Sequence, residues 1–186
     1  MWIIIIGILV VVIALVLIFI FTAYNGLVST RQKVKNSWGH VEVQLQRRFD
    51  LLPNLVETVK GYMKHEEKTL TEIVRLRTSW ASAGTMAEKA GLSNQLESTL
   101  KSIMALSESY PELKANTGFF QLQQELGNTE NKIAFSRQFY NDTVTIYNTK
   151  IEVFPSNLVA GMFGFKDEEL FTVEDNTARM NPGITF

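Results

Sequence analysis

The sequence predicts an all-α protein in which an N-terminal transmembrane helix continues into an antiparallel up-down helical bundle. Two observations lead to this fold class. Residues 2–21 are all apolar or glycine, and about 20 such residues in a helix span the hydrocarbon core of a bilayer. Beyond that run, apolar residues recur at alternating intervals of three and four, which places them on one face of a helix.

The N-terminal run is expected to stay in place as a membrane anchor over residues 1–23. Trp2 and Tyr24 flank the run at the two positions where amphipathic rings settle at membrane interfaces. A cleaved signal peptide would have basic residues before a shorter apolar run and a small-x-small cleavage site after it. The sequence has neither feature, and a buried core helix fits poorly with so long a stretch of Ile, Val and Leu.

Charge on either side of the anchor predicts its orientation. Arg31, Lys33 and Lys35 follow the apolar run, whereas no basic side chain precedes it. Membrane proteins keep such Lys and Arg residues on the cytoplasmic side. We therefore expect a single-pass protein with its N-terminus outside and its C-terminal domain in the cytoplasm.

Amphipathic segments over residues 24–49, 51–80, 85–113 and 119–154 predict a bundle spanning 24–154. The third segment begins at a capping box, Thr85 to Glu88. At the first junction, Asp50 could cap a new helix that has Pro53 in its first turn. Alternatively, one long helix is kinked at Pro53, which leaves three long helices instead of four. We favour the turn, because segments of similar length are typical of an up-down bundle.

Residues 155–186 form an apolar segment followed by an acidic tail that is expected to be irregular. If the fourth helix returns to the membrane, the apolar segment lies near the bilayer. Its position suggests that some aromatic and apolar side chains rest at the membrane interface, although packing against the bundle core would also suit them. The candidate interface residues are Phe154, Met162, Phe163 and Phe165.

Composition excludes several classes of function. The net charge of −1 gives no case for a nucleic-acid binder. The chain has no cysteine, which excludes disulfides, thiol catalysis and cysteine metal sites. His65-Glu66 begins like a zinc-protease motif but lacks the second histidine four residues on, and His40 lies on another segment. We therefore predict no catalytic residue, no metal site and no cofactor.

Charged residues on apolar helix faces predict buried ion pairs. Arg48 lies on the stripe of the first segment, and Arg137 lies among aromatic residues of the fourth. A buried charge needs a partner, because unpaired burial is strongly unfavourable. We expect such a pair to fix helix register, with a partner-binding patch as the alternative. The candidate members are Arg47, Arg48 or Arg137 with acids such as Asp50, Glu57 or Glu130.

A Tyr-Asn dipeptide occurs three times and forms a candidate helix-packing signature. A tyrosine can bury its ring while its hydroxyl keeps a polar partner, and an asparagine can bridge helices. We expect ring packing and hydrogen bonds between helices, with recognition of a partner peptide or lipid head group as the alternative. The dipeptides are Tyr24-Asn25, Tyr140-Asn141 and Tyr147-Asn148.

Three blocks of sequence carry a resemblance that covers nearly the whole chain. They are Tyr24–Val28 with Arg31, Val43–Tyr62, and Phe135–Asn148 continued by Phe154–Phe165. With these blocks the chain resembles the bacterial LemA family. The resemblance implies a helical bundle behind an N-terminal anchor, in the bacterial inner membrane and with a cytoplasmic domain. It implies no enzymatic activity; some relatives occur in magnetosome membranes, and others are encoded beside membrane metalloproteases.

Taken together, these features predict a non-catalytic, membrane-anchored helical scaffold. We expect it to contact membrane lipid, to form homo-oligomers and to organise or shape the membrane. The alternative is an adaptor or sensor for a membrane protease or an envelope-stress pathway.

Overall fold

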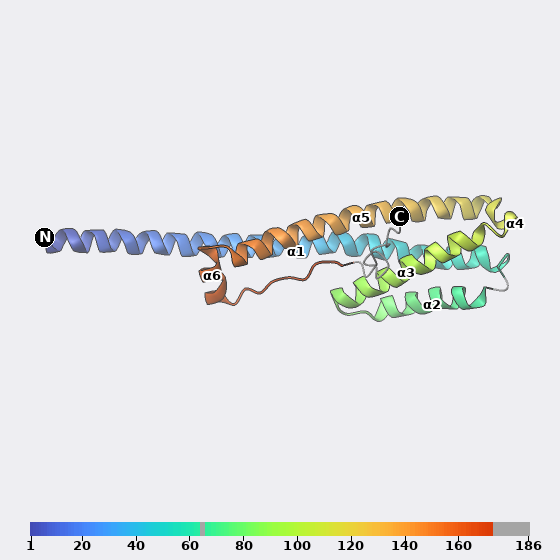
Figure 1. The fold of residues 1–186 in the computed structure, drawn as a ribbon, viewed down its shortest axis with the longest axis horizontal. Coiled ribbons are helices and arrows are strands. Elements are labelled where there is room, and N and C mark those ends of the chain that lie inside the picture. Colours follow the sequence, from blue (N-terminus) through green and yellow to red (C-terminus); the bar gives the residue numbers. More distant parts are fainter. Residues whose placement is uncertain (64–65, 173–186) are drawn as a thin grey trace, which may run out of the picture. The chain divides into compact units, whose positions relative to one another are not determined.

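The computed structural model describes residues 1–63 and 66–172, which form six α-helices and no strand (Figure 1). The predicted all-α fold class is therefore confirmed. One of the six helices, over residues 111–114, is a single turn. The helices are α1 (Trp2–Lys60), α2 (Glu67–Ser82), α3 (Met86–Ser107), α4 (Pro111–Lys114), α5 (Thr117–Glu152) and α6 (Ser156–Phe163).

Helix α1 runs without interruption through Asp50 and Pro53, so the predicted turn at Asp50 is wrong. The one-helix alternative holds through Pro53 but not as far as residue 80, because α1 ends at Lys60 and α2 follows as a separate helix. The apolar stripe passes through this point in phase, and Phe49, Leu52 and Leu55 are all buried. Pro53 removes one backbone donor from the helix. The free energy gained by burying the apolar stripe on both sides of Pro53 exceeds the cost of that one lost hydrogen bond.

The break in the predicted second segment falls instead between α1 and α2. Helix α1 ends at Lys60, and the backbone N–H groups of Tyr62 and Met63 both donate to the Val59 carbonyl, which closes the last turn. A basic residue in the last turn followed by Gly61 is a common helix stop. The unbroken apolar stripe on either side concealed this signal.

Two side-chain caps set the starts of α3 and α5. The Thr85 hydroxyl accepts from the Glu88 N–H at 3.2 Å, and the Glu88 carboxylate accepts from the Thr85 N–H at 3.0 Å. This is the capping box that the sequence predicts. The backbone donors lower the pKa of the Glu88 carboxyl. At α5, the Asn116 side-chain oxygen accepts from the Phe119 N–H at 3.0 Å and so caps the start of the helix.

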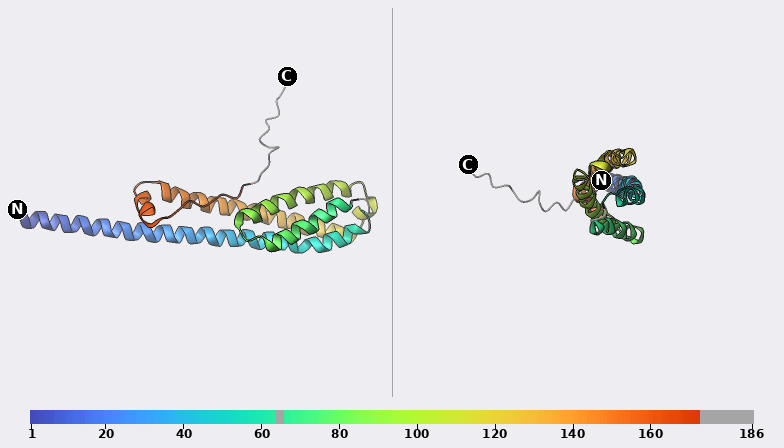
Figure 2. Two further views of the ribbon diagram at one scale, coloured as in Figure 1. Left: turned by 90° about the horizontal axis from the view of Figure 1, so that it is seen from below. Right: turned by 90° about the vertical axis from the view of Figure 1, so that its right-hand side faces the viewer.

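The chain forms two compact units, and α1 and α5 contribute residues to both. Of the described residues, the first unit contains 1–41 and 136–170, and the second contains those of 42–135 together with Phe171 and Thr172. In the second unit the end of α1, α2, α3 and the start of α5 run up and down beside one another (Figure 2). The second unit is therefore a four-helix bundle of alternating direction.

Apolar and aromatic side chains fill the second unit. The rings of Phe49 on α1 and Trp80 on α2 stack with centroids 4.4 Å apart. The Trp80 indole N–H donates to Gln46 Oε1 at 2.9 Å. The Lys89 ammonium from α3 lies over the Trp80 ring and pairs with Glu42. The buried apolar residues include Leu45, Leu52, Leu55, Ile73, Leu76, Leu96, Ile103, Phe119, Leu126 and Ile133.

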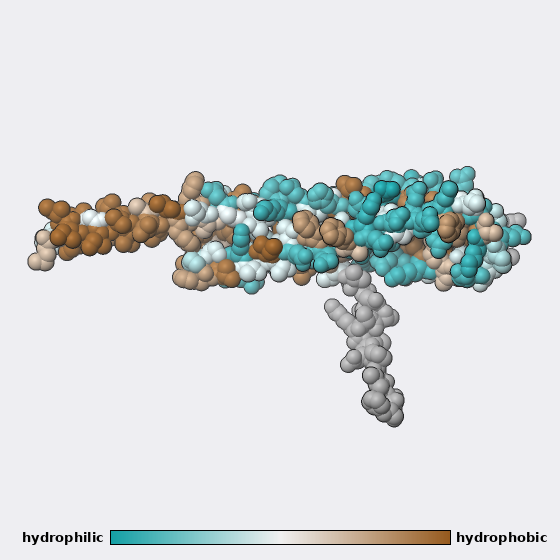
Figure 3. Space-filling view, turned by 90° about the horizontal axis from the view of Figure 1, so that it is seen from above, coloured by the Kyte–Doolittle hydropathy of each residue, from teal (hydrophilic) through white to brown (hydrophobic). Residues whose placement is uncertain are grey.

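In the first unit, the start of α1 is exposed and the remainder packs against α5 and α6. Residues 2–18 of α1 are exposed, and the visible face of this run is hydrophobic (Figure 3). Among the described residues α1 is the one helix long and apolar enough to cross a membrane. Beyond the run, Leu27 on α1 forms a small core with Val159 and Ala160 of α6. Helix α6 thus packs where the apolar run ends.

Candidate functional site

Within residues 1–63 and 66–172, no three His, Cys, Asp or Glu side chains gather where they could hold a metal ion. His40 is exposed on α1, and His65 lies outside the described residues. Each unit contains a cluster of polar side chains that joins separate elements of the chain. We call these clusters the arginine lock (Arg48, Ser93 and Glu130) and the tail clasp (Tyr140, Tyr147 and Asn148).

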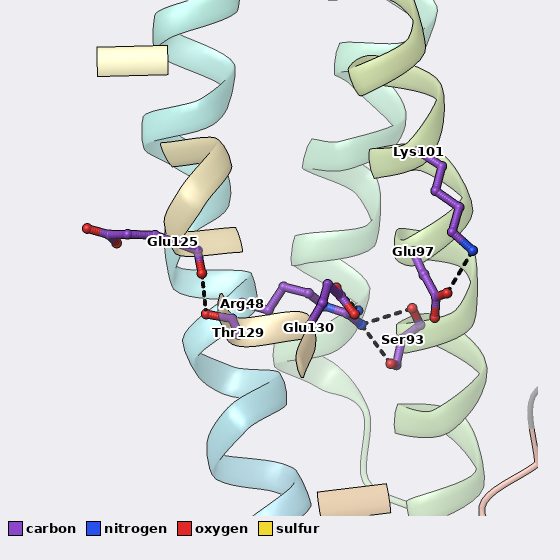
Figure 4. A network of polar contacts seen from close by, with 7 residues as sticks. All are labelled: Arg48, Ser93, Glu97, Lys101, Glu125, Thr129 and Glu130. Carbon is purple, nitrogen blue, oxygen red and sulfur yellow. Dashed lines mark hydrogen bonds and ion pairs between the residues drawn. The ribbon is translucent and has the colours of Figure 1, made fainter. Parts of the chain in front are cut away.

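The arginine lock joins three helices of the second unit through one buried guanidinium (Figure 4). The Arg48 side chain on α1 is 0% exposed. Its Nη1 donates to Glu130 Oε1 on α5 at 2.6 Å. Its Nη2 donates to the carbonyl and the hydroxyl of Ser93 on α3, at 2.9 Å and 2.6 Å. The planar guanidinium can serve several acceptors at once, which a lysine ammonium does less specifically.

The partial exposure of Glu130 lowers the free-energy cost of burying its ion pair with Arg48. Its side chain is 33% exposed, so the carboxylate keeps water on one side while it neutralises Arg48. Two nearby bonds lie within single helices: on α5 the Thr129 hydroxyl donates to the Glu125 carbonyl at 2.8 Å, and on α3 Lys101 pairs with Glu97 at 2.9 Å. A buried pair of this kind is better suited to fixing register than to adding stability.

Of the predicted ionic residues, the structure brings together Arg48 and Glu130. Arg47 and Asp50 are exposed on α1, where the Asp50 carboxylate accepts from Gln46 at 2.8 Å. Arg137 lies half-buried on α5. Sequence reasoning missed Ser93. The available signal was its phase, because Ser93 precedes Leu96 and Leu100 on the buried face of α3.

The tail clasp binds the backbone of an extended segment, residues 166–169, to α5 in the first unit. The Tyr147 hydroxyl donates to the Lys166 carbonyl at 3.0 Å, and the Tyr140 hydroxyl donates to the Glu169 carbonyl at 2.8 Å. The Asn148 amide donates to the Glu168 carbonyl at 2.9 Å and accepts from the Glu168 N–H at 3.0 Å. The asparagine thus satisfies both backbone groups of one residue, as a neighbouring strand would.

The expected hydrogen bonds between helices are wrong for these three side chains, because their partners lie in a non-helical segment. An extended segment cannot pair its own backbone groups, so side chains on α5 supply the partners. The expected ring packing does occur: Tyr140 meets Trp38 of α1 edge to face at 5.5 Å. Asn141 is half-buried on α5, and Asn25 is exposed on α1.

Burial changes the titration of the clasp tyrosines. The Tyr140 side chain is almost fully buried, and burial together with the nearby Glu168 and Glu169 carboxylates raises its pKa to about 12. Burial also raises the pKa of Tyr147, while Arg31 acts in the opposite direction. Both hydroxyls therefore remain protonated donors under ordinary conditions.

Helix α6 and Phe165 pack against α1 where its apolar run ends. Val159 and Ala160 are buried against Leu27, with Ile20 and Ala23 beside them. The Tyr24 ring contacts Phe163 at 4.7 Å and Phe165 at 5.8 Å. Phe165 is half-buried, whereas the other candidate interface residues are exposed by between 52% and 78%. These are Phe154, Met162 and Phe163.

The fold and these arrangements define a class, a membrane-associated helical protein. The chain belongs to the LemA family, whose family model matches residues 37–186. The resemblance found in the sequence is thereby confirmed. Members of this family are not known enzymes.

Individual relatives match over most of the chain. Protein LemA of Metamycoplasma hominis is 24% identical over 152 residues, which cover 81% of this chain and 69% of that protein. Magnetosome protein MamQ 2 of Paramagnetospirillum magneticum is 25% identical over 188 residues, or 87% and 68% of the two chains. Magnetosome protein MamQ of Magnetospirillum gryphiswaldense is 23% identical over 174 residues, or 80% and 64%.

Removing the charge of Glu130 is expected to lower the free energy of unfolding more than removing the charge of Arg48. Glu130→Gln should lower the free energy of unfolding by about 3 kcal/mol, because it leaves a buried guanidinium without a counter-charge. Arg48→Met should have a smaller effect, because the partly exposed Glu130 carboxylate can regain water. Urea unfolding in mild detergent measures both, with Arg47→Met as the exposed control. If Arg48→Met changes neither stability nor assembly, the interpretation of Arg48 and Glu130 as a pair that fixes helix register is wrong.

The tail clasp is expected to lose stability in alkali. The folded-state pKa of Tyr140 lies above the ordinary tyrosine value of 10, so its contribution is complete below about pH 10 and is lost as pH rises toward about 12. Tyr140→Phe should lower the free energy of unfolding by about 1 kcal/mol at neutral pH. It should also flatten the decline between pH about 10 and about 12.

Denaturant unfolding followed by circular dichroism over this pH range tests the clasp, with Tyr110→Phe as a control tyrosine outside it. An alkaline decline that is equally steep in Tyr140→Phe and in the unsubstituted protein would contradict this assignment.

Proposed function

We propose that this chain is a non-catalytic, membrane-anchored scaffold that self-associates and organises or shapes the bacterial inner membrane. The observation that carries the proposal is an exposed apolar stripe that runs along α5 and reaches one residue past its end. Phe139 and Ile146 on α5, and Val153 just after it, lie seven residues apart and are between 46% and 56% exposed. The opposite face of α5 is occupied within the first unit, where Tyr140, Val144 and Tyr147 are buried.

A spacing of seven residues is the repeat that two helices use to pair along one seam. Exposed apolar stripes of this kind mark interaction surfaces, because water contacts them unfavourably. Two copies anchored in one membrane share the same orientation, so a two-fold axis along the membrane normal would align their α5 helices in parallel. Each stripe residue would then face its own counterpart. The intervening Asp142 and Thr149 would keep the seam weak, as suits reversible assembly.

The membrane part of the proposal rests on the exposed apolar run and the basic residues after it. We propose that the N-terminus lies outside and that the bundle lies in the cytoplasm, because Arg31, Lys33 and Lys35 follow the run. The names of the MamQ relatives associate those proteins with magnetosomes, which supports a role in organising membrane for this chain.

Disulfide formation between copies tests the stripe directly, because the chain has no cysteine of its own. In native membranes, Ile146→Cys is expected to form a disulfide-linked dimer on mild oxidation. The adjacent exposed position, Thr145→Cys, points away from the seam and should form much less. A disulfide requires Cα atoms within about 7 Å, so it separates the two positions.

Equal crosslinking at both positions, or none at Ile146, would contradict the stripe as the seam. A strictly monomeric mass in mild detergent would contradict self-association altogether. Recovery of a membrane protease with the crosslinked chain, in place of a second copy, would support the adaptor function instead.

The orientation is tested by cysteine labelling in spheroplasts with a maleimide that does not cross membranes. Glu112→Cys, beside the exposed end of the bundle in the second unit, is expected to react after lysis and not before. Trp2→Cys is expected to react in intact spheroplasts. Labelling of Glu112→Cys in intact spheroplasts would reverse the proposed orientation.

A further inference from the structure

We propose that the groove between the end of the anchor and α6 binds one anionic phospholipid, with α6 lying in the interfacial layer of the bilayer. This inference rests on the anchor being in the membrane and not on self-association.

The groove is almost wholly apolar. It has a volume of about 590 Å³, and its walls include Leu17, Ile18, Ile20 and Phe21 of α1 and Phe163 of α6. Two lining residues carry a hydroxyl, Thr22 and Tyr24. The Thr22 hydroxyl donates to the carbonyls of Ile18 and Phe19 at 2.9 Å each, and Tyr24 lies at the end of the groove. The walls therefore present hydrocarbon to their occupant, which suits an acyl chain and not a polar ligand.

The position of the groove along α1 selects a bilayer lipid as the occupant. The groove starts within the apolar run, at Leu17, and ends at Tyr24, where the run ends. At 1.5 Å per residue this stretch is about 10 Å long. It therefore covers the depth between the upper acyl chains and the head groups of one leaflet. A Tyr ring at its upper end is at the depth that amphipathic rings prefer.

Helix α6 is fixed at this depth by its own packing and cap. Val159 and Ala160 are buried against Leu27. Gly164 ends the helix at φ 68°, in the left-handed region, and the Phe165 N–H donates back to the Ala160 carbonyl at 3.0 Å. This cap is a Schellman-type turn, which needs glycine at that position. The cap fixes the end of α6, and the contacts of Val159 and Ala160 with Leu27 and of Phe163 with Tyr24 hold the helix against α1.

The outward side of α6 is suited to lipid. Leu158 and Met162, at an interval of four residues, are exposed, as is Phe154 just before the helix. Such a cluster on a helix of eight residues is unfavourable in water and favourable in the interfacial layer. It is continuous with the exposed surface of the anchor, because α6 packs beside Ile20 and Ala23.

Two cations stand beyond the polar end of the groove. Arg31 lies one heptad after Tyr24, on the same face of α1, and its guanidinium stacks over Phe165 at 5.3 Å. None of the ion pairs formed among the described residues uses Arg31. The second cation is Lys150 of α5. Its ammonium donates at 2.8 Å to the hydroxyl of Thr30, the residue before Arg31 on α1. Basic groups at this position along α1, on the head-group side of Tyr24, attract the phosphate of an anionic head group.

Depth measurements on the full-length protein in lipid nanodiscs test the position of α6. Carbonate extraction first establishes that the anchor is inserted, so a failed anchor is recognised separately. A fluorophore on Met162→Cys or Leu158→Cys should be quenched about two-fold by lipids with a shallow acyl-chain quencher. The control is Val74→Cys, an exposed apolar position on α2 in the second unit, which should not be quenched. Equal signals at Met162 and Val74 would overturn the proposal.

Lipid analysis tests the head-group preference. The protein is extracted from nanodiscs of mixed neutral and anionic phospholipid, and the retained lipid is quantified by mass spectrometry. Anionic lipid should be enriched several-fold on the unsubstituted protein and on the control Arg47→Gln, and the enrichment should be lost in Arg31→Gln. Retained lipid with the composition of the disc, in all three proteins, would overturn the anionic site. The dimer crosslink at Ile146 is read independently, so the two proposals fail separately.

Discussion

The burial of Arg48 imposes the constraint on which the bundle depends. A guanidinium without water needs acceptors in fixed places, and those acceptors come from Ser93 on α3 and Glu130 on α5. They can meet Arg48 only if α1 keeps one register through the bundle. The apolar stripe of α1 imposes the same register, because Leu45 and Leu52 on either side of Arg48 are buried. Packing and charge therefore agree, and this agreement explains why α1 continues through Pro53.

The first unit is stabilised in a different way. Its small apolar core around Leu27 is supplemented by side chains that bind backbone groups. Tyr140, Tyr147 and Asn148 hold an extended segment that has no strand beside it. This arrangement gives Tyr140 and the Tyr147-Asn148 dipeptide a physical role: their side chains replace a missing secondary-structure partner. Phe165, the residue before this segment, contacts Tyr24 near the end of the apolar run of α1. A polar clasp on α5 and an aromatic contact on α1 thus position α6.

The sequence allowed the helices to be predicted where stripe and cap agree, as at Thr85, and the buried pair to be anticipated because Arg48 interrupts an apolar stripe. It misplaced the first break, because the stripe is in phase on both sides of Asp50 and masks the weaker stop at Gly61. Ser93 was missed because a small neutral residue on a helix face carries no charge signal. The tail clasp could not be predicted, since its acceptors are backbone carbonyls of a segment whose return along α5 leaves no periodic pattern.

Continuity of α1 through Asp50 is the claim on which the lock and the bundle both rest. The most direct measurement is the distance between spin labels at Val43→Cys and Glu57→Cys, two exposed positions of α1 in the second unit. In one helix these positions are 14 residues apart, so a continuous α1 predicts a backbone separation of about 21 Å. A turn at Asp50 would bring the two halves side by side, at about 8–10 Å. That shorter distance would show that α1 is broken at Asp50.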